Sequence, residues 1–167
     1  MRRTLHHNLI VNPKPVSLAG WSRFGDCEVR MVAAGDAIWI KNTTGGGGRG
    51  IDLPMPTLPA GDYVARLHGS FSGYTPGETV LLVKKGGQYI AVTRFAGDPG
   101  GRGFTTRFTL DTPGCNILVT PPEARLAAIA VKRFLITTAS DAESMLAAGV
   151  EWFDGDGYQL GGGGLIP

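Results

Sequence analysis

The chain has 167 residues, of which 43% are hydrophobic, 26 are glycine and 11 are proline, and its formal net charge is +2. This length and apolar content suffice for one domain with its own core, and the small, scattered charge argues against nucleic acid or an acidic membrane surface as the partner. No apolar run approaches the length of a membrane span. The apolar run 9–11 that follows the basic start ends at Asn12-Pro13, too soon for a secretory signal. We therefore expect synthesis in the cytoplasm with no secretion signal.

Short apolar or alternating runs predict strands along the first half of the chain. In order, these runs are 8–11, 28–33, 37–41, 51–53 and 62–70. The last run alternates with the period of two that is typical of a half-buried strand. Its faces carry Tyr63, Ala65 and Leu67 on one side and Val64, Arg66 and His68 on the other. The segment Gly45–Gly50 predicts a loop too flexible to pair with a strand.

The second half continues the same pattern and adds one helix. Strands are predicted at 79–84, 88–95, 104–110, 115–120 and 126–138. Lys85-Gly86-Gly87 predicts a hairpin, because glycine tolerates the positive φ of such a turn. Ser140 or Asp141 as N-cap and Gly149 as the stop predict a short helix near residues 141–148.

Roughly eight or nine short strands, with no alternation of strand and helix, predict an all-β fold: a jelly-roll β-sandwich with one short C-terminal helix. We expect the sandwich domain to span residues 1–158 and a Gly-rich C-terminal tail to span 159–167. Cys27 and Cys115 are too few for a disulfide scaffold and too far apart for a zinc knuckle. Both are expected to be buried free thiols.

Two motifs near the ends of the chain resemble a known family. The run 8–13, Asn-Leu-Ile-Val-Asn-Pro, followed by Gly20-Trp21, is similar to the start of carbohydrate-binding-module-like jelly rolls of phage tail proteins and bacterial cell-surface enzymes. The run 152–156, Trp-Phe-Asp-Gly-Asp, resembles the ending of minor tail proteins of actinobacteriophages. The chain departs from that ending at Gly157, where proline or threonine is usual, and in its tetraglycine tail.

The resemblance implies a phage virion tail component, a minor tail or fibre-tip protein made in the host cytoplasm. Such a protein would attach to a host cell-surface glycan or build the tail tip, with other tail proteins as partners. A homo-oligomer, with a trimer favoured, would gain avidity. Two alternatives stay open: a free carbohydrate-binding module or lectin-like protein, and a cell-wall glycan hydrolase domain.

In a jelly roll the first and last strands are neighbours, and their pairing covers an edge that would otherwise invite aggregation. We therefore expect the strand at 8–11 to pair near residues 129–136.

The sequence gives no reason to expect an enzyme. The acidic residues lie mostly in turns, where aspartate is explained by its hydrogen bonds to the turn backbone, and no Gly-x-Ser-x-Gly motif is present. Asp154 and Asp156 have the spacing of calcium ligands, but the further acids of a complete loop are missing, which favours a solvated turn. We expect no catalytic residues, no cofactor and no metal.

The candidate glycan-binding residues are Trp39, Arg66, His68, Tyr89 and Arg107. By alternation they fall opposite apolar residues assigned to the core, among them Ile40, Leu67, Ile90 and Phe108. If their strands adjoin, the polar residues line one face of a sheet. A guanidinium and an aromatic ring suit the hydroxyls and the apolar face of a pyranose. An ordinary solvated face is the alternative, and Trp21 and Trp152 are expected to be packing residues.

Overall fold

A computed structural model describes residues 5–9, 17–53, 55–97, 103–150, 157–159 and 164–166. Within these ranges the strands are β1 (Leu5–His7), β2 (Ser22–Phe24), β3 (Cys27–Met31), β4 (Ile38–Asn42), β5 (Gly50–Asp52), β6 (Gly61–Ser72), β7 (Thr79–Lys85), β8 (Gln88–Arg94), β9 (Gly103–Leu110), β10 (Asn116–Val119), β11 (Ala128–Thr138), β12 (Gly157–Gln159) and β13 (Gly164–Ile166). The single helix of the described residues, α1, spans Ala139–Ala147.

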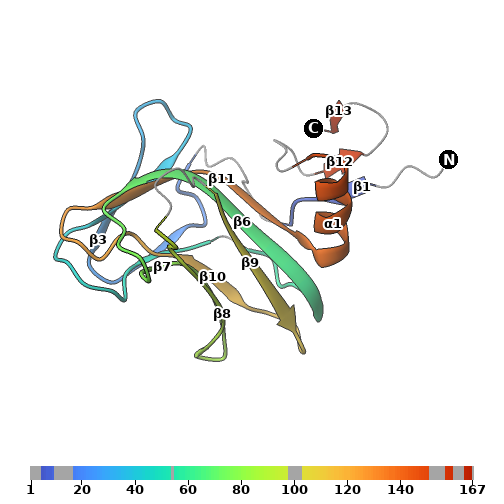
Figure 1. The fold of residues 1–167 in the computed structure, drawn as a ribbon, viewed down its shortest axis with the longest axis horizontal. Coiled ribbons are helices and arrows are strands. Elements are labelled where there is room, and N and C mark those ends of the chain that lie inside the picture. The colour runs from blue at the N-terminus through green and yellow to red at the C-terminus, as the bar shows by residue number, and fades with distance from the viewer. Residues whose placement is uncertain are drawn as a thin grey trace.

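Two five-stranded antiparallel sheets face each other (Figure 1). The first, called the β8 sheet here, has the order β2-β5-β10-β7-β8, and the second, the β6 sheet, has the order β3-β4-β11-β6-β9. From β4 to β11 every connection crosses between the sheets except the β7–β8 hairpin at Gly86 and Gly87. This topology confirms the predicted jelly-roll β-sandwich and hairpin.

The core lies between the sheets and follows the predicted alternation. Along β9 exposed and buried residues alternate at every position, with Phe104, Thr106 and Phe108 buried. The ring of Phe71 on β6 contacts the rings of Tyr74, Phe95 and Phe104, with centroid distances of 5.2, 5.4 and 5.5 Å. Each buried aromatic or large aliphatic side chain stabilises the fold by about 1.5–3 kcal/mol. Through this aromatic cluster, β6 and β9 pack against the segments that precede β7 and follow β8 in the facing sheet.

Helix α1 follows β11 without a break and covers one end of the outer face of the β6 sheet (Figure 1). Its buried residue Met145 packs against Leu135 of β11. The predicted N-cap at Ser140 or Asp141 is wrong by two or three residues. Thr138, the last residue of β11, keeps an extended backbone, and its hydroxyl accepts the Asp141 amide hydrogen at 3.2 Å. A strand residue can therefore cap the helix directly.

The N-terminal segment closes onto β11, although not as the predicted strand. β1 pairs instead with β12, which pairs with β13 in a small third sheet beside α1 (Figure 1). Asn8 is buried, and its side-chain amide donates to the Phe134 carbonyl at 2.9 Å and accepts from the Ile136 amide at 3.0 Å. The Leu9 amide donates to the Ile136 carbonyl at 2.8 Å. The predicted neighbourhood is thus confirmed for Asn8 and Leu9, and residues 10–16 lie outside the described ranges.

The glycine-rich segment after β4 is organised around Asn42. This buried side chain donates to the carbonyls of Gly46 at 2.9 Å and Pro122 at 3.0 Å, and it accepts the Gly45 amide at 2.8 Å. Gly50 is the first residue of β5, with φ +152°, and a Cβ at this position would come 2.0 Å from the Val119 carbonyl oxygen. The prediction of a loop without strand pairing is therefore wrong at Gly50.

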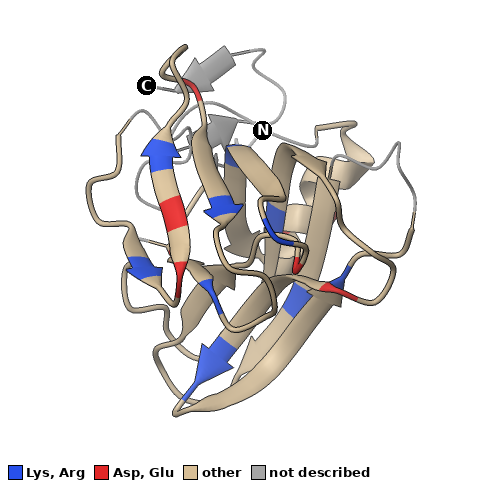
Figure 2. Ribbon diagram, turned by 90° about the vertical axis from the view of Figure 1, so that its left-hand side faces the viewer, with Lys and Arg blue, Asp and Glu red and all other residues tan. Residues whose placement is uncertain are grey.

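The spread of the charged residues agrees with the sequence analysis, and the prediction of buried thiols is confirmed for Cys27 but not for Cys115. The Lys and Arg residues of the described part of the chain are spread over several strands and loops of both sheets and form no single patch (Figure 2). Cys27 is buried and Cys115 is half-buried, and both are free thiols. Burial raises the pKa of both thiols. The domain boundary at residue 158 stays a prediction.

None of the described helical residues forms a segment long and apolar enough to cross a membrane.

Replacing Asn8 tests whether the N-terminal segment contributes to the stability of β11. Asn8→Ala leaves the Phe134 carbonyl and the Ile136 amide without their side-chain partner in a buried site, which costs about 1–3 kcal/mol of unfolding free energy per group. Urea unfolding should show this loss, whereas Gln88→Ala at an exposed position should change stability by less than about 0.5 kcal/mol. An unchanged midpoint for Asn8→Ala would mean that this closure is not part of the cooperative fold.

Candidate functional site

The predicted site residues divide between the two sheets. Trp39 on β4, Arg66 and His68 on β6 and Arg107 on β9 share the outer face of the β6 sheet. Tyr89 lies on β8, in the opposite sheet. The expectation that these strands adjoin is confirmed for β6 and β9 and wrong for β8, because the chain crosses between the sheets after β8. Alternation assigns a side chain to a face, but it does not say to which sheet that face belongs.

Two of the predicted residues already have partners within the protein. The outward orientation of Trp39 is confirmed, and the guanidinium of Arg30 lies 4.2 Å from its ring centroid, with the Lys41 ammonium at 5.4 Å. Arg107 faces Glu143 of α1, with 3.8 Å between Nη1 and Oε1. Neither residue lines one of the two concave surfaces described below.

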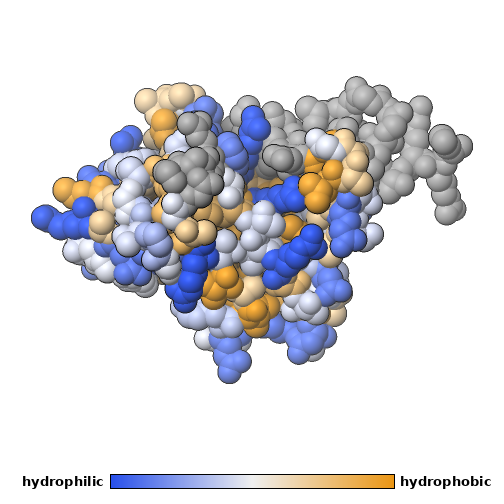
Figure 3. Space-filling model, in the orientation of Figure 1, coloured by the Kyte–Doolittle hydropathy of each residue, from blue (hydrophilic) through white to orange (hydrophobic). Residues whose placement is uncertain are grey.

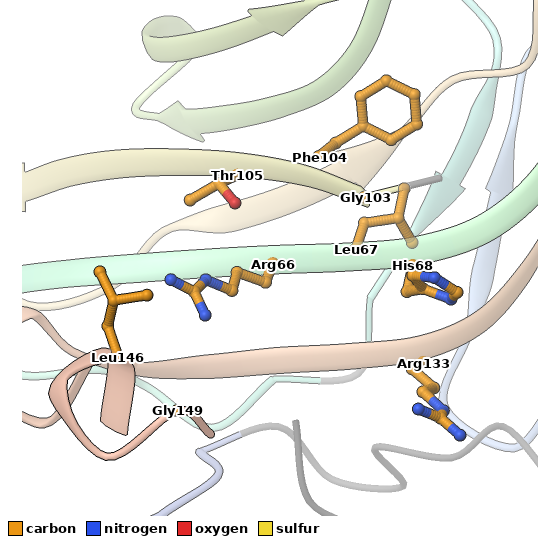
Figure 4. Close-up of a pocket in the computed structure, with 9 residues that line it drawn as sticks. All are labelled: Arg66, Leu67, His68, Gly103, Phe104, Thr105, Arg133, Leu146 and Gly149. Atoms are coloured by element: carbon orange, nitrogen blue, oxygen red, sulfur yellow. The ribbon is translucent and has the colours of Figure 1, made fainter. Parts of the chain in front are cut away.

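The larger concave surface, called the α1 hollow here, has a volume of about 550 Å³ on the outer face of the β6 sheet. It is lined by Arg66, Leu67, His68, Gly103, Phe104, Thr105, Arg133, Leu146 and Gly149. Arg66 extends from β6 toward Leu146, while His68 and Arg133 lie close together on neighbouring strands (Figure 4). In the space-filling view, strongly hydrophilic residues lie beside apolar residues next to α1 (Figure 3).

The smaller concave surface, called the β8 groove here, has a volume of about 170 Å³ on the outer face of the β8 sheet. It is lined by Phe24, Gly47, Gly48, Arg49, Thr79, Leu82, Tyr89, Val92, Arg94, Thr120, Pro121 and Glu123. Sites that enclose a small molecule usually measure about 300–1,000 Å³. The groove is therefore too small to enclose a ligand, and a ligand would lie across it.

The floor of the β8 groove is apolar although it belongs to an outer face. Leu82 on β7 and Val92 on β8 line this floor and are paired across strands. Leu118 on β10 is paired with Leu82 and extends the apolar strip beyond the groove, and Leu82 and Leu118 are only 8% and 7% exposed. Tyr89 projects beside this floor with 62% of its surface exposed. A β-bulge shifts the register of β7 and β8 between Val83 and Lys84 and leaves Ile90 40% exposed. The assignment of Ile90 to the core is therefore wrong.

Polar residues follow one side of this apolar floor. Asp52 on β5 stands opposite Leu118, and Lys84 on β7 stands opposite Asn116 and Tyr89, with its ammonium 6.0 Å from the tyrosine ring centroid. Burial raises the pKa of the Asp52 carboxyl, and a hydrogen bond from Asn116 and the charge of Lys84 oppose the rise. Its Oδ1 atom is buried and has no hydrogen-bond partner among the described residues.

The other side of the floor is formed by side chains that the fold holds in place. Arg94 donates to the Gly77 carbonyl at 2.9 Å and to the Thr79 hydroxyl at 3.2 Å. Arg49 donates to the Gly47 carbonyl and to Asn42 Oδ1, both at 3.2 Å. These bonds fix the rim before any ligand arrives, which lowers the entropic cost of binding.

Sequence reasoning missed Asp52, Phe24 and Leu118. The sequence pattern that could have identified Asp52 is the short run 51–53, in which this charged residue stands between two apolar strand residues and is therefore expected to face outward. Phe24 belongs to β2, a strand that was not predicted because its three residues carry no alternation.

Within the described residues there is no group of three or more His, Cys, Asp and Glu that could hold a metal ion. Asp154 and Asp156, considered above as calcium ligands, and Trp152 lie outside the described ranges. Trp21 is half-buried and packs against the core as expected.

The β8 groove has the properties that a flat amphipathic ligand requires. An apolar strip with an exposed aromatic ring offers van der Waals contact, and it is flanked on both sides by donors and acceptors. One of these acceptors, Asp52 Oδ1, is buried and has no partner among the described residues.

Solved structures of similar fold extend this description. An arabinose-bound α-L-arabinofuranosidase matches 89% of this chain with a TM-score of 0.61 and 16% identity, and the match covers 31% of that chain. The second N-terminal cellulose-binding domain of Cellulomonas fimi β-1,4-glucanase C matches 80% of this chain and 95% of its own length, with a TM-score of 0.52 and 20% identity. The xylohexaose complex of Clostridium thermocellum endo-1,4-β-D-xylanase 10B matches 81% of this chain and 28% of that chain, with a TM-score of 0.52 and 15% identity.

No protein-family model matches the sequence, and no curated protein matches it. At identities of 15–20% the structural matches show the fold: the chain has the β-sandwich fold that is also found in a cellulose-binding domain of nearly the same extent. It spans about a third of the arabinofuranosidase and of the xylanase structures, so those enzymes contain much that this chain does not match.

The pH dependence of stability tests the burial of Asp52. Because its pKa is raised in the fold, the folded protein holds this proton more tightly than the unfolded chain. The contribution of this proton to the free energy of unfolding is complete when the pH is below the pKa of the carboxyl in the unfolded chain. It is lost as the pH rises through the pKa of the carboxyl in the folded protein. Asparagine at position 52 does not titrate, so Asp52→Asn does not lose this stability as the pH rises. Urea unfolding between pH 3 and pH 7 should therefore show the variant becoming more stable relative to the parent as the pH rises.

Asp111 serves as a control of opposite sign. A hydrogen bond and the charge of Lys85 lower the pKa of Asp111, so its ionised form stabilises the fold and this contribution is lost as the pH falls. Asp111→Asn should therefore lose stability relative to the parent as the pH rises. A pH-independent difference between Asp52→Asn and the parent would contradict the assignment of Asp52 as a partly buried carboxyl with a raised pKa.

Proposed function

We propose that this chain is a non-enzymatic glycan-binding module and that the glycan lies across the β8 groove. The observation that carries this proposal is the apolar strip of Leu82, Leu118 and Val92 beside the exposed ring of Tyr89, with the unpartnered Asp52 Oδ1 on its flank. A pyranose ring is amphipathic in the same sense, because its faces are apolar and its edge carries hydroxyl groups. The ring of Tyr89 suits the apolar face, and Asp52 accepts a hydrogen bond from a hydroxyl.

The shape of the groove favours a polymer over a free monosaccharide. The groove is open and too small to enclose one sugar ring fully, so a single ring would bury little surface and bind weakly. A chain of sugars crossing the strands from Phe24 on β2 to Tyr89 on β8 would add contacts along its length. The similarity of fold to a cellulose-binding domain and to a xylanase in complex with xylohexaose supports a polysaccharide as the ligand.

The proposed biological setting is the tail of a phage virion, where the module would attach to a host cell-surface glycan or contribute to the tail tip. This rests on the resemblance of the motifs at 8–13 and 152–156 to those of minor tail proteins. A free carbohydrate-binding module or lectin-like protein is equally consistent with the fold. A module appended to a glycan hydrolase is the third reading, because two of the similar structures are glycosidases that extend well beyond the matched part.

Assembly into a homo-oligomer, with a trimer favoured, belongs to the tail proposal. The two main sheets end in the edge strands β2, β8, β3 and β9, which are available for contacts between subunits. Repetition of a weak site raises the overall avidity. Light scattering of the full chain at micromolar concentration should give a mass near three times 17.6 kDa. A 17.6 kDa monomer would count against a tail role and leave glycan binding untouched.

Adsorption to purified actinobacterial cell walls and to insoluble xylan and cellulose tests glycan binding at the groove. Tyr89→Ala should weaken adsorption about three- to tenfold, because a stacked aromatic contact is lost. Tyr89→Phe keeps the ring and should bind close to the parent. The melting temperatures of both variants should stay close to the parent, since position 89 is exposed.

Leu126→Ala provides a matched control, because Leu126 is 55% exposed and lines neither the β8 groove nor the α1 hollow. It should adsorb like the parent. If Tyr89→Ala also adsorbs like the parent on every polymer, the β8 groove is not the binding surface.

A further inference from the structure

The α1 hollow lies on the opposite sheet from the β8 groove and plays no part in the function proposed above. Its volume of about 550 Å³ falls within the usual range of about 300–1,000 Å³ for sites that enclose a small ligand. Strands β6, β9 and β11 form its base, and the end of α1 forms one wall (Figure 4). It is the larger of the two concave surfaces described for this protein.

Among the described residues that line the hollow, the charged groups are all basic. Arg66 and Arg133 contribute two guanidinium groups, and none of these described residues is acidic. Strand register places these groups side by side: Arg133 stands opposite His68, and Arg66 stands opposite Thr105 on β9. A planar guanidinium is the side-chain group best suited to bind a carboxylate or a phosphate, and the Thr105 hydroxyl adds a neutral donor.

Backbone irregularities create this arrangement. The register of β11 and β6 shifts between Val131 and Arg133, and beyond this bulge Arg133 faces outward beside His68. Opposite the bulge stands Gly69, where a Cβ would come 2.4 Å from the Ala130 carbonyl oxygen, so the two strands approach closely only because this residue is glycine. Bulges commonly re-aim side chains at functional sites. The chain therefore bends at this point in a way that sets its basic side chains around the hollow.

The guanidinium of Arg66 extends toward Leu146 (Figure 4), and part of its hydrogen-bonding capacity is not used by the described residues. Its Nε atom is buried and has no hydrogen-bond partner among the described residues. A buried donor without an acceptor costs free energy that a bound acceptor would recover. Gly103, opposite His68, leaves space at the far side, because a Cβ there would meet only the Leu67 carbonyl oxygen, at 3.9 Å.

We infer that the α1 hollow is a second binding site, which takes a sugar residue carrying a carboxylate or phosphate group. Arg66 and Arg133 bind the oxyanion, Thr105 binds a neighbouring hydroxyl, and the exposed side chain of Leu146 contacts the apolar edge of the ring. The claim that the ligand is a sugar rests on the proposed function, whereas the claim that the ligand is an anion rests only on the residues of the hollow.

Titration calorimetry of the full chain with glucuronate, glucose 6-phosphate, glucose and inorganic phosphate tests this inference. Glucuronate or glucose 6-phosphate should bind, and glucose should bind at least about tenfold more weakly. Added salt should lower the affinity for the charged ligands. Binding of glucose 6-phosphate no tighter than inorganic phosphate would overturn the assignment of a sugar. Equal affinity for glucuronate, glucose 6-phosphate and glucose would overturn the assignment of an anion.

Three variants locate the site. Arg66→Gln should lower the affinity for the acidic sugar at least about tenfold. Arg30→Gln removes the same charge at the β3 edge of the same sheet and should bind the acidic sugar like the parent. Gly103→Val fills the hollow without touching a charge and should also abolish binding. Undiminished affinity in both Arg66→Gln and Gly103→Val would overturn the inference.

The two sites can fail independently. Tyr89→Ala should leave the affinity for acidic sugars unchanged, and Gly103→Val should leave adsorption to neutral polysaccharide unchanged. Loss of polysaccharide adsorption in Gly103→Val at an unchanged melting temperature would mean that one site accounts for both activities, and it would overturn the assignment of a second site.

Discussion

The pairing of β11 with β6 is the constraint on which the rest of the structure depends. The two strands pair from Thr138 opposite Tyr63 to Ala128 opposite Ser72, with one register shift between Val131 and Arg133, and they occupy the middle of their sheet. Their inner faces carry much of the core, including Phe134, Ile136, Ala65 and Leu67. Burial of these side chains fixes the register, because a shift by one residue would expose them all. Every other element is placed relative to this pair.

The outer face of the same pair shows how the fold divides its surface. At one end Val64, Leu135 and Thr137 are buried although they face outward, and Met145 of α1 packs on Leu135. The helix stands there because Thr138 ends the strand and caps the helix at once. Next to this covered end the bulge at Val131–Arg133 opens the α1 hollow. The chain therefore uses one pair of strands to build the core, to support the helix and to place Arg66 on β6 and Arg133 on β11.

The two concave surfaces differ in chemistry because they belong to different sheets. The β8 groove has an apolar floor, an exposed tyrosine and the carboxylate of Glu123, and it is the smaller of the two. The α1 hollow is larger and has basic residues, and among the described residues that line it only His68 presents an exposed aromatic ring. A module with both surfaces could contact a polymer through one face and an acidic sugar through the other. Such an arrangement would gain affinity through two weak contacts without any change in either.

The sequence alone determined the local features of this protein. Alternation in 62–70 and 104–110 assigned Tyr63, Leu67 and Phe108 to the core and Arg66, His68 and Arg107 to the surface, because side chains on a strand alternate whatever the strand pairs with. Glycine at positions 86 and 87 predicted the hairpin for a similarly local reason. From these signals the all-β jelly-roll class and its single helix followed.

Only the tertiary structure decided which surfaces meet. Tyr89 and Arg66 each point outward as predicted, but they lie on opposite sheets because the chain crosses between β8 and β9. Strand pairing between segments far apart in the sequence produces three further features. These are the bulge that exposes Ile90, the bulge that turns Arg133 outward, and the contacts that partly bury Asp52. Such pairings depend on the packing of distant segments, which no local pattern contains, and they decide where the groove and the hollow form.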